Sequence, residues 1–508
     1  MVKPCFYWSC TALATMYYLL KLFPEITIKS RSVRRHMTRC LAANVRNTLK
    51  PLDRRIAVRD GWDLLRVSLP VSAGAALVDE VEARLTRMPG VQEVQEVREV
   101  DFSDLDEITA QVVPRWQAHV TGRRFRVSAK RRGRHDFSSE DLERHLGAAL
   151  LAAAPDARVD LTHPEVKVTV EVVDQRLRLI DRRLPGLGGY PLGLQGQAMA
   201  LISGGYDSPV AAWRMIRRGI KTHFLFFNLG GPEHERGVRE VTHHLWQRYS
   251  ASHRVNFISV PFEPVVGEIL RRVPDGMMGV VLKRMMVRAA SRIARRHRVP
   301  ALVTGDAIAQ VSSQTLTNLA LIDDASELPL LRPLLTDDKQ TIITQAREID
   351  TARFAESMPE YCGVISRRPH TRARRDQIAA AEAGFDFAVL DAAVDAAEIT
   401  RIDRLAESPG AAAAAQTKDE VLEAREGEDV SVIDIRPEGE REAAPLTLPT
   451  GRRLEIPFYE LQQRAPQLPD DRHYFLYCDQ GVMSRMQALH LHDRGLTHFG
   501  VYLASSAR

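Results

Sequence analysis

The fold of the central part of this 508-residue chain is decided by Leu201-Ile202-Ser203-Gly204-Gly205-Tyr206-Asp207-Ser208-Pro209. An apolar run at residues 198–202 predicts a short strand, and Pro209 suits the first turn of a helix. The two glycines remove Cβ atoms where an anion must approach the backbone closely. Successive backbone N–H groups can then converge on phosphate oxygens at the positive end of the helix. The stretch therefore predicts a pyrophosphate-binding turn between a strand and a helix.

The alternative for these residues is a glycine turn that binds nothing, but all six positions from Ser203 to Ser208 fit an anion-binding turn. A Walker loop requires Gly, four residues and then Gly-Lys-Ser/Thr, and the sequence contains no such run. The turn therefore favours chemistry at the α-phosphate, with release of pyrophosphate, over transfer of the terminal phosphate. In this respect it resembles the PP-loop of the ATP pyrophosphatase superfamily.

Strand-like runs at residues 222–227, 257–260 and 301–304 extend this turn into a doubly wound α/β domain. The residues before it alternate strands and helices and predict two α+β modules, and an alanine-rich stretch after it predicts a linker to a last α/β domain. We therefore expect an α/β multidomain protein. Its expected parts are residues 1–15, 16–75, 76–183, 184–395, the linker 396–425, and 426–508.

The first 20 residues raise a question of targeting. The segment from Cys5 to Leu20 is apolar behind Lys3 and weakly resembles a signal peptide. Residues 17–22, however, make a good opening strand, and Met16 is a candidate initiator. We therefore expect residues 1–15 to be a non-native or wrongly assigned extension. No later segment has the ~18 uninterrupted apolar residues that a membrane span needs.

Basic residues are concentrated in two stretches, although the net charge is only +5. Residues 123–134 contain no acidic residue, and residues 283–298 are basic at helical spacing. Such blocks attract polyanions by releasing counterions from phosphates, although a solvated surface is the alternative for each stretch alone. Beside a nucleotide-binding turn they favour RNA. The candidate RNA-binding residues are Arg123, Arg124, Lys130, Arg131, Arg132 and Arg134.

The five cysteines show no CxxC spacing, which argues against a disulfide framework or a zinc site and fits a reducing cytoplasm. His234, Glu235, His243 and His244 lack a ligand spacing and are expected to be structural or exposed. We expect no metal bound by the protein alone.

Cys478 lies in Phe475-Leu476-Tyr477-Cys478-Asp479-Gln480-Gly481-Val482, which predicts a thiol between a strand end and a helix. Turn amides and the helix start stabilise a sulfur anion there, so the thiol can hold a persulfide. With Val432-Ile433-Asp434-Ile435-Arg436-Pro437, this stretch resembles a rhodanese domain. A buried structural cysteine is the alternative. Cys362 is either a core thiol or a second thiol that closes a disulfide with Cys478 when sulfur leaves.

From about Met16 to the C-terminus the chain resembles the tRNA 4-thiouridine synthetase (tRNA sulfurtransferase) family, in its long form with a rhodanese tail. The resemblance implies a ferredoxin-like domain at residues 16–75, a THUMP RNA-binding domain at 76–183, a PP-loop adenylating domain at 184–395 and a rhodanese domain at 426–508. The supporting runs are Lys21-Leu22-Phe23-Pro24-Glu25-Ile26-Thr27-Ile28-Lys29, Lys130-Arg131-Arg132-Gly133-Arg134-His135-Asp136-Phe137-Ser138-Ser139, Phe226-Phe227-Asn228-Leu229-Gly230-Gly231, Leu282-Lys283-Arg284-Met285-Met286 and Gln310-Val311-Ser312-Ser313-Gln314-Thr315.

The resemblance also implies a reaction. Uridine at position eight of tRNA is adenylated by ATP, which brings Mg²⁺ with it, and AMP is then displaced by sulfur from a Cys478 persulfide. Cys362 is the implied resolving thiol, through a redox disulfide with Cys478. A cytoplasmic cysteine desulfurase would load the sulfur. The family can also donate sulfur toward the thiazole of thiamine, which allows a sulfur carrier protein as a partner; a homodimer stays open.

Residue by residue, the resemblance places Asp207 and Lys339 in the activation step. Lys339 follows Thr336-Asp337-Asp338, a credible helix start, and a surface lysine is its alternative. The implied ATP-site residues are Leu201, Ile202, Ser203, Gly204, Gly205, Ser208, Lys283, Gly305 and Gln314.

Two other functions remain at this stage. An amide-forming PP-loop ligase would leave Cys362 and the rhodanese-like tail without a role. A non-catalytic RNA-binding protein is disfavoured by the intact Ser203 to Ser208 turn and by Cys478.

Overall fold

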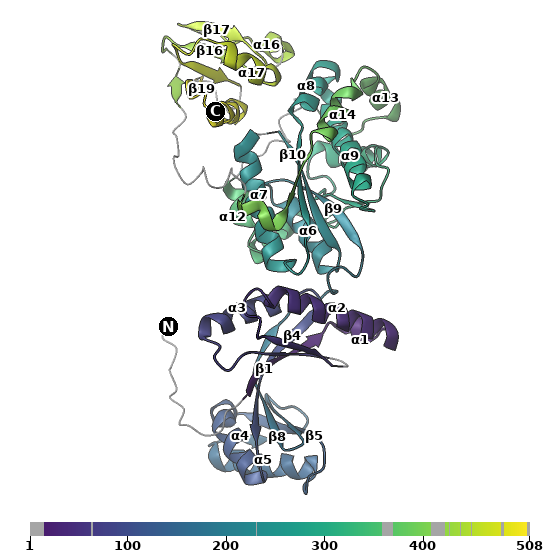
Figure 1. Ribbon diagram of the computed structural model, residues 1–508, viewed down its shortest axis with the longest axis vertical. Helices are drawn as coiled ribbons and strands as arrows, with labels where there is room; N and C mark the ends of the chain where they lie inside the picture. Colours follow the sequence, from purple (N-terminus) through teal and green to yellow (C-terminus); the bar gives the residue numbers. More distant parts are fainter. Residues whose placement is uncertain are drawn as a thin grey trace. The chain divides into compact units, whose positions relative to one another are not determined.

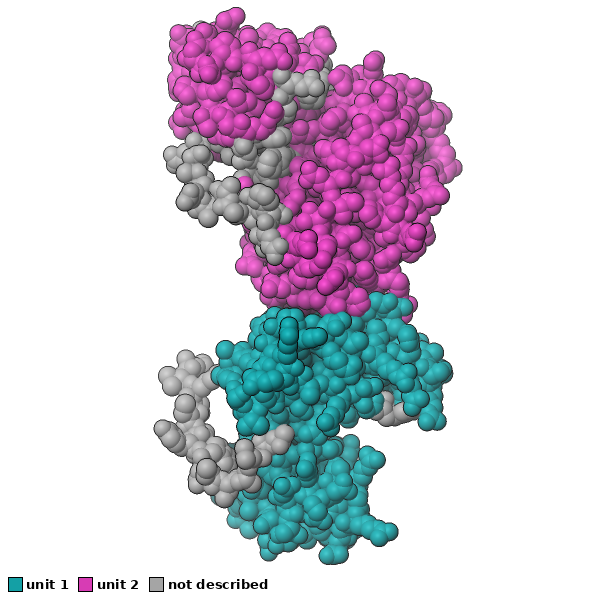
Figure 2. All heavy atoms as spheres, viewed as in Figure 1, with its two compact units in different colours: residues 1–194 teal, residues 195–508 magenta. Residues whose placement is uncertain are grey.

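The computed structural model describes residues 15–61, 64–229, 231–357, 369–407, 422–425, 427–436, 438–448, 450–478 and 482–504. Two compact units divide the chain, Met1–Leu194 and Gln195–Arg508 (Figure 2). Each unit has its own sheets and hydrophobic core. Among the described residues, no helix is both long enough and apolar enough to cross a membrane. The expected extension, residues 1–15, lies almost entirely outside the described residues.

The first unit is built on one eight-stranded sheet with the order β2-β3-β1-β4-β8-β7-β5-β6. Figure 1 labels β1, β4, β5 and β8 of this sheet. The predicted opening strand is confirmed as β1, which runs antiparallel between β3 and β4 and buries Tyr17 and Tyr18 completely. The strands are β1 (Thr15–Leu22), β2 (Ala57–Asp60), β3 (Leu64–Ser68), β4 (Val91–Asp101), β5 (Arg124–Arg132), β6 (Arg158–Val159), β7 (Val166–Val173) and β8 (Arg176–Pro185).

Helices α1 (Pro24–Thr27), α2 (Arg31–Leu49) and α3 (Ala75–Thr86) complete the N-terminal part of this unit. Leu41 and Val45 of α2 share one core with Val81 and Leu85 of α3. The predicted division at residue 75 therefore falls inside this core, and the structure places α3 and β4 with the N-terminal module. The cause is β4, a single long strand that pairs with β1 along one edge and with β8 along the other.

The remaining half of the first unit packs α4 (Leu105–Val120) and α5 (Ser139–Ala153) around a second core with β5, β7 and β8. Phe125, Leu142 and Val168 are completely buried in it. Asp104 caps α4, and Ser138 with Asp141 forms a capping box that fixes the start of α5.

The second unit contains the predicted doubly wound sheet, with the order β13-β12-β9-β10-β11-β14. All four predicted strands are present, and only β14 is antiparallel to its neighbour. The strand order reverses between β9 and β12, and a crevice forms at such a point outside the carboxyl ends of the strands. The strands are β9 (Gln197–Ile202), β10 (Lys221–Asn228), β11 (Asn256–Pro261), β12 (Leu302–Val303), β13 (Leu330–Leu331) and β14 (Glu398–Arg401).

Helices cover this sheet, with α6 packed against α7 and α8 against α9 (Figure 1). Their apolar faces fill a core that includes Leu225, Ile258 and Met285. The helices are α6 (Asp207–Arg217), α7 (Gly231–Tyr249), α8 (Glu263–Arg272), α9 (Met278–Arg296), α10 (Leu316–Asp323), α11 (Lys339–Glu348), α12 (Ala352–Ser357), α13 (Arg375–Ala383) and α14 (Phe387–Asp395).

The predicted linker, 396–425, is structured at both ends. β14 joins the central sheet through β11, and a 3₁₀ helix (Ile402–Glu407) follows it. At the other end, β15 (Glu423–Arg425) is the edge strand of a five-stranded parallel sheet with the order β15-β19-β18-β16-β17. This sheet also contains β16 (Ser431–Asp434), β17 (Arg452–Glu455), β18 (Tyr474–Tyr477) and β19 (Phe499–Leu503), with helices α16 (Glu438–Ala443), α17 (Phe458–Arg464) and α18 (Val482–Asp493).

Candidate active site

The predicted pyrophosphate turn lies at the crevice, between the end of β9 and the start of α6. Ser208 Oγ accepts a hydrogen bond from the Ser203 backbone N–H at 2.8 Å and lies 3.0 Å from Ser203 Oγ. The Ser208 hydroxyl therefore closes the turn on itself. The first backbone N–H groups of α6 have no acceptor within the helix, and the dipole gives this end a positive partial charge. The turn can thus receive an anion of pyrophosphate size.

Leu201 and Ile202 are the last residues of β9, immediately before the turn, and pair with Leu225 and Phe226 of β10. This pairing fixes the backbone from which the turn departs.

Gly305 lies after β12, on the other side of the point where the strand order reverses. A Cβ atom on Gly305 would stand 2.8 Å from the carbonyl carbon of Asp207 and 2.8 Å from the backbone nitrogen of Ser208. Side-chain carbons do not approach backbone atoms so closely without displacing them. The loop after β12 therefore packs directly on the first turn of α6, and only glycine permits this contact.

We expect Gly305→Ala to weaken nucleotide binding about tenfold, because overpacking strain of about 1–3 kcal/mol would push the two loops apart. Titration of the purified variant with ATP measures this directly. Gly384→Ala is the matched control, since no atom lies within 4 Å of its added Cβ. Equal ATP affinities in the two variants would contradict the packing argument.

A buried carboxylate that the sequence analysis missed, Asp306, lies next to Gly305. Its Oδ1 accepts hydrogen bonds from Lys283 Nζ at 2.5 Å and from Gln314 Nε2 at 3.1 Å. Its Oδ2 accepts from the Thr304 hydroxyl at 2.8 Å and from Arg332 Nε at 3.3 Å. Burial alone would raise the pKa of Asp306, but Lys283 and these hydrogen bonds hold the pKa well below its usual range. The only feature of the sequence that could have indicated a role for Asp306 was its place just after the predicted strand at residues 301–304.

Asp207 forms a second cluster at the start of α6. Lys339 Nζ donates to its two carboxylate oxygens at 2.9 and 3.1 Å, and Gln310 Nε2 donates to Oδ2 at 2.9 Å. Lys339 begins α11, and Asp338 caps this helix, so the predicted helix start is confirmed. The structure thus brings Asp207 and Lys339 together and adds Gln310, which lies in a run that the sequence analysis quoted without giving this residue a role.

Two buried amide oxygens in this crevice, Gln310 Oε1 and Gln314 Oε1, have no hydrogen-bond partner among the described residues. Buried polar atoms are normally paired, so these two acceptors fit a ligand that carries N–H or O–H donors. A nucleotide offers such donors on its base and ribose, together with phosphates for the cationic side chains. The residues present therefore fit ATP.

The histidines near this domain do not form a metal site. Within the described part of the chain, no group of three or more His, Cys, Asp or Glu side chains could hold a metal ion. Burial lowers the pKa of His234 to about 4, and its ring packs edge-on against Phe226 at 4.8 Å. Glu235 accepts hydrogen bonds from Asn228 and Ser259. His234 and Glu235 therefore make structural contacts, which is one of the two roles expected for them.

Cys478 lies directly after β18, as predicted, and α18 begins four residues later. The Ser484 backbone N–H, in the first turn of α18, donates to Cys478 Sγ at 3.3 Å, and Sγ lies 3.5 Å from Ser484 Oγ. The thiol is free and only partly buried. An N–H donor at a helix start stabilises a sulfur anion, as a persulfide carrier requires.

The strand beside Cys478 carries a buried ion pair whose role the sequence analysis did not identify. Arg436 binds both carboxylate oxygens of Asp434, at 2.7 and 2.9 Å, and each residue is at most 3% exposed. The Arg436 guanidinium also lies 4.8 Å from the ring centre of Tyr477, the residue before Cys478. The ion pair therefore lies where the end of β16 pairs with the end of β18, directly before Cys478. Cys362 lies outside the described residues.

The first basic stretch forms β5 and the turn after it. Arg123, Arg124, Lys130, Arg131, Arg132 and Arg134 are all exposed. Some are paired, such as Arg124 with Glu165, but no described carboxylate lies within ion-pair distance of Arg132 or Arg134. This surface can therefore attract phosphates.

The second basic stretch, 283–298, is not a free cationic surface. It forms α9, where Arg284 and Arg288 pair with Glu382, and Arg292, Arg295 and Arg296 pair with Asp391, Glu327 and Asp395. Its contribution to RNA binding stays a prediction, and the carboxylates that pair with its arginines are distant in the sequence.

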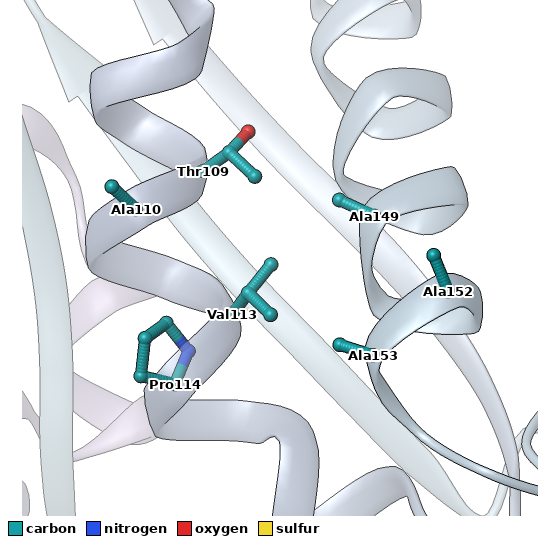
Figure 3. A pocket seen from close by; sticks show the side chains of 7 residues that line it. All are labelled: Thr109, Ala110, Val113, Pro114, Ala149, Ala152 and Ala153. Atoms are coloured by element: carbon teal, nitrogen blue, oxygen red, sulfur yellow. The ribbon is translucent and has the colours of Figure 1, made fainter.

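An apolar groove of about 490 Å³ lies between α4 and α5 in the first unit (Figure 3). Thr109 carries the only side-chain polar group among its lining residues, so the groove offers no catalytic chemistry. Its lining residues are Thr109, Ala110, Val113, Pro114, Ala149, Ala152 and Ala153.

Comparison with known proteins adds to this geometry. The family model for thiamine biosynthesis protein (ThiI) matches residues 193–387, and the model for the THUMP domain matches residues 100–179. The tRNA sulfurtransferases of Erwinia tasmaniensis and Sodalis glossinidius are each 47% identical to the chain, over 96% of its length and 100% of theirs. The tRNA sulfurtransferase of Escherichia coli is 46% identical with the same coverage.

Among solved structures, the chain is similar to that of a 4-thiouridine synthetase in complex with RNA and bound ATP. The TM-score is 0.67 at 24% identity, covering 76% of this chain and 99% of the other. At this identity the likeness concerns the fold.

Proposed function

We propose, since the chain belongs to the tRNA sulfurtransferase family, that it uses ATP to convert uridine at position eight of tRNA into 4-thiouridine. One observation carries the proposal: the Ser203 to Ser208 turn opens into a crevice lined by Lys283, Lys339 and two buried amide oxygens, of Gln310 and Gln314, that have no partner among the described residues. Such a site suits a nucleoside triphosphate that releases pyrophosphate. The free thiol of Cys478, on a separate sheet, supplies the second half of the chemistry.

The first step activates the uridine. Its C4 oxygen attacks the α-phosphorus of ATP, so that an O–P bond forms while the bond to the pyrophosphate oxygen breaks. Backbone N–H groups of the Ser203 to Ser208 turn hold the departing pyrophosphate, and Lys283 and Lys339 neutralise the phosphate charge that develops. Asp207 orients Lys339. It would also be the residue to hold the Mg²⁺ that accompanies ATP, which would supply further neutralisation of phosphate charge.

The second step replaces oxygen by sulfur. The terminal sulfur of a Cys478 persulfide attacks C4 and AMP departs, which leaves the uridine joined to Cys478 through a disulfide. A Cys362 thiolate then attacks Cys478 Sγ, releases 4-thiouridine and closes a Cys362–Cys478 disulfide. In an alternative order, Cys362 attacks the persulfide first and releases hydrosulfide. Both orders oxidise two thiols, so an external thiol reductant must restore the enzyme.

The remaining assignments concern partners. We propose that a cytoplasmic cysteine desulfurase loads Cys478, and that Arg123, Arg124, Lys130, Arg131, Arg132 and Arg134 bind tRNA phosphates on the domain matched by the THUMP model. Delivery of sulfur toward the thiazole of thiamine, through a sulfur carrier protein, is a second outlet for the same persulfide, which the ThiI family description supports.

The test is direct. The purified chain is incubated with unmodified tRNA, Mg-ATP, a cysteine desulfurase with cysteine, and a reductant, and 4-thiouridine is followed by its near-ultraviolet absorption. We expect thiolation that depends on ATP and releases AMP and pyrophosphate together. ATP consumption without sulfur on tRNA would overturn the proposal.

A further inference from the structure

Asp306 occupies an unusual position for a carboxylate. It is 7% exposed, and its two oxygens accept four hydrogen bonds, from Lys283, Gln314, Thr304 and Arg332. Four donors fill the lone-pair sites of a carboxylate. Asp306 therefore has no free acceptor for a further donor, and its own negative charge disfavours contact with phosphate. Any influence on a nucleotide must pass through the groups that it holds.

We propose that Asp306 is a positioning residue of the ATP site, which fixes Lys283, Gln314 and Arg332 in one arrangement before the nucleotide binds. This inference rests on the proposed ATP-dependent function. Two of the three held groups are cations, and Asp323 pairs with one of them, Arg332. The cluster is therefore close to neutral, and Asp306 contributes the position of Lys283 rather than an excess of positive charge.

The held groups are restrained from more than one side. Arg332 also binds Asp323 at 2.6 Å and is only 8% exposed. The loop that carries Gln314 is closed by a hydrogen bond from the Ala309 N–H to the Gln314 carbonyl at 3.0 Å, with Ala309 in the left-handed region at φ 64°. Thr304, two residues before Asp306, fixes the carboxylate itself.

Positioning has an energetic consequence for ligand binding. A free lysine side chain has high rotamer entropy, and ordering it when ATP arrives would subtract from the affinity. Asp306 orders Lys283 beforehand. The low pKa of Asp306 keeps the carboxylate charged throughout the physiological range, so this restraint does not depend on pH.

Two other roles for Asp306 make different predictions. If the carboxylate merely competed with ATP for Lys283, its removal would tighten ATP binding. If it only stabilised the fold, its removal would lower the melting temperature and affect ATP binding equally with or without Lys283.

The experiment is a double-mutant cycle with ATP affinity as the readout, on full-length protein. We expect Asp306→Asn to weaken ATP binding about tenfold, and Asp306→Glu, which keeps the charge, to restore most of the loss. In a Lys283→Met background we expect Asp306→Asn to weaken binding by only about threefold, because Gln314 and Arg332 alone are left to lose their positions. Glu382→Gln is the matched control, because Glu382 also pairs with two buried or half-buried cations, Arg284 and Arg288, away from the crevice.

Tighter binding by Asp306→Asn, or an equal loss in both backgrounds, would overturn the proposal. If Asp306→Asn alone does not fold, the Lys283→Met/Asp306→Asn variant removes one cation and one anion together, and its affinity must then lie within about threefold of that of Lys283→Met. Wild-type protein that binds no ATP would instead refute the proposed function itself.

Discussion

Cys478→Ala is expected to abolish the transfer of sulfur to tRNA while leaving ATP-dependent activation intact. Cys478 Sγ lies between the end of β18 and the start of α18, where it accepts a hydrogen bond from the Ser484 N–H at 3.3 Å. The variant lacks this sulfur atom. Loss of a nucleophile typically lowers turnover by on the order of 1,000-fold or more. Thiolation should therefore fall below detection in a near-ultraviolet assay.

Activation provides the internal control for this variant. The nucleotide crevice is built from a different sheet, so pyrophosphate release in the presence of tRNA should persist in Cys478→Ala. Cys40→Ala is the matched thiol control, since Cys40 is the other free and partly buried cysteine among the described residues.

Cys362→Ala should also lose thiolation, through failure to release sulfur, and a non-reducing peptide map after one turnover should contain the Cys362–Cys478 pair. Unimpaired thiolation in both variants would refute the assigned roles.

The central domain could be predicted from the sequence because its strands are short apolar runs. Residues 198–202, for example, form the middle of a parallel sheet, where helices cover both faces and no polar alternation appears. The glycine turn was equally visible, since its chemistry lies in consecutive residues. Cys478 was found for the same reason.

The missed features depend on residues that meet only in space. Asp306 receives Lys283 from 23 residues before it and Arg332 from 26 residues after it. The ion pairs of the basic stretch in α9 could not be predicted, because Arg284 and Arg292 contact carboxylates 98 and 99 residues away. Likewise, the division at residue 75 was misplaced because β4 belongs to one sheet with strands on both sides of it.

Asp207 and Lys339 were identified in the sequence, but their contact with each other was not. The resemblance assigned both to the activation step, but only the structure pairs them, at 2.9 and 3.1 Å, across the crevice from α6 to α11. A lysine at the first position of a helix is ordinarily a surface residue. Its contact with the first residue of α6 places Lys339 beside the glycine turn instead.

Lys339→Met is therefore expected to reduce the rate of pyrophosphate release by about 100-fold or more, the usual cost of removing one group that stabilises developing charge. The effect should fall mainly on kcat rather than on the KM for ATP, because the ammonium is most valuable once negative charge builds up on the transferred phosphate. Lys221→Met is the matched control, since Lys221 begins β10 at the opposite end of the sheet from the crevice.

Asp207→Asn should cause a loss of at least similar size, and the double variant should lose little more than Asp207→Asn alone, because Lys339 acts through its pairing with Asp207. Additive losses would mean that Asp207 and Lys339 contribute independently. Near-normal pyrophosphate release in Lys339→Met would remove Lys339 from the activation step, and the charge on the α-phosphate would then have to be met by Lys283, the other lysine that the structure places at the crevice.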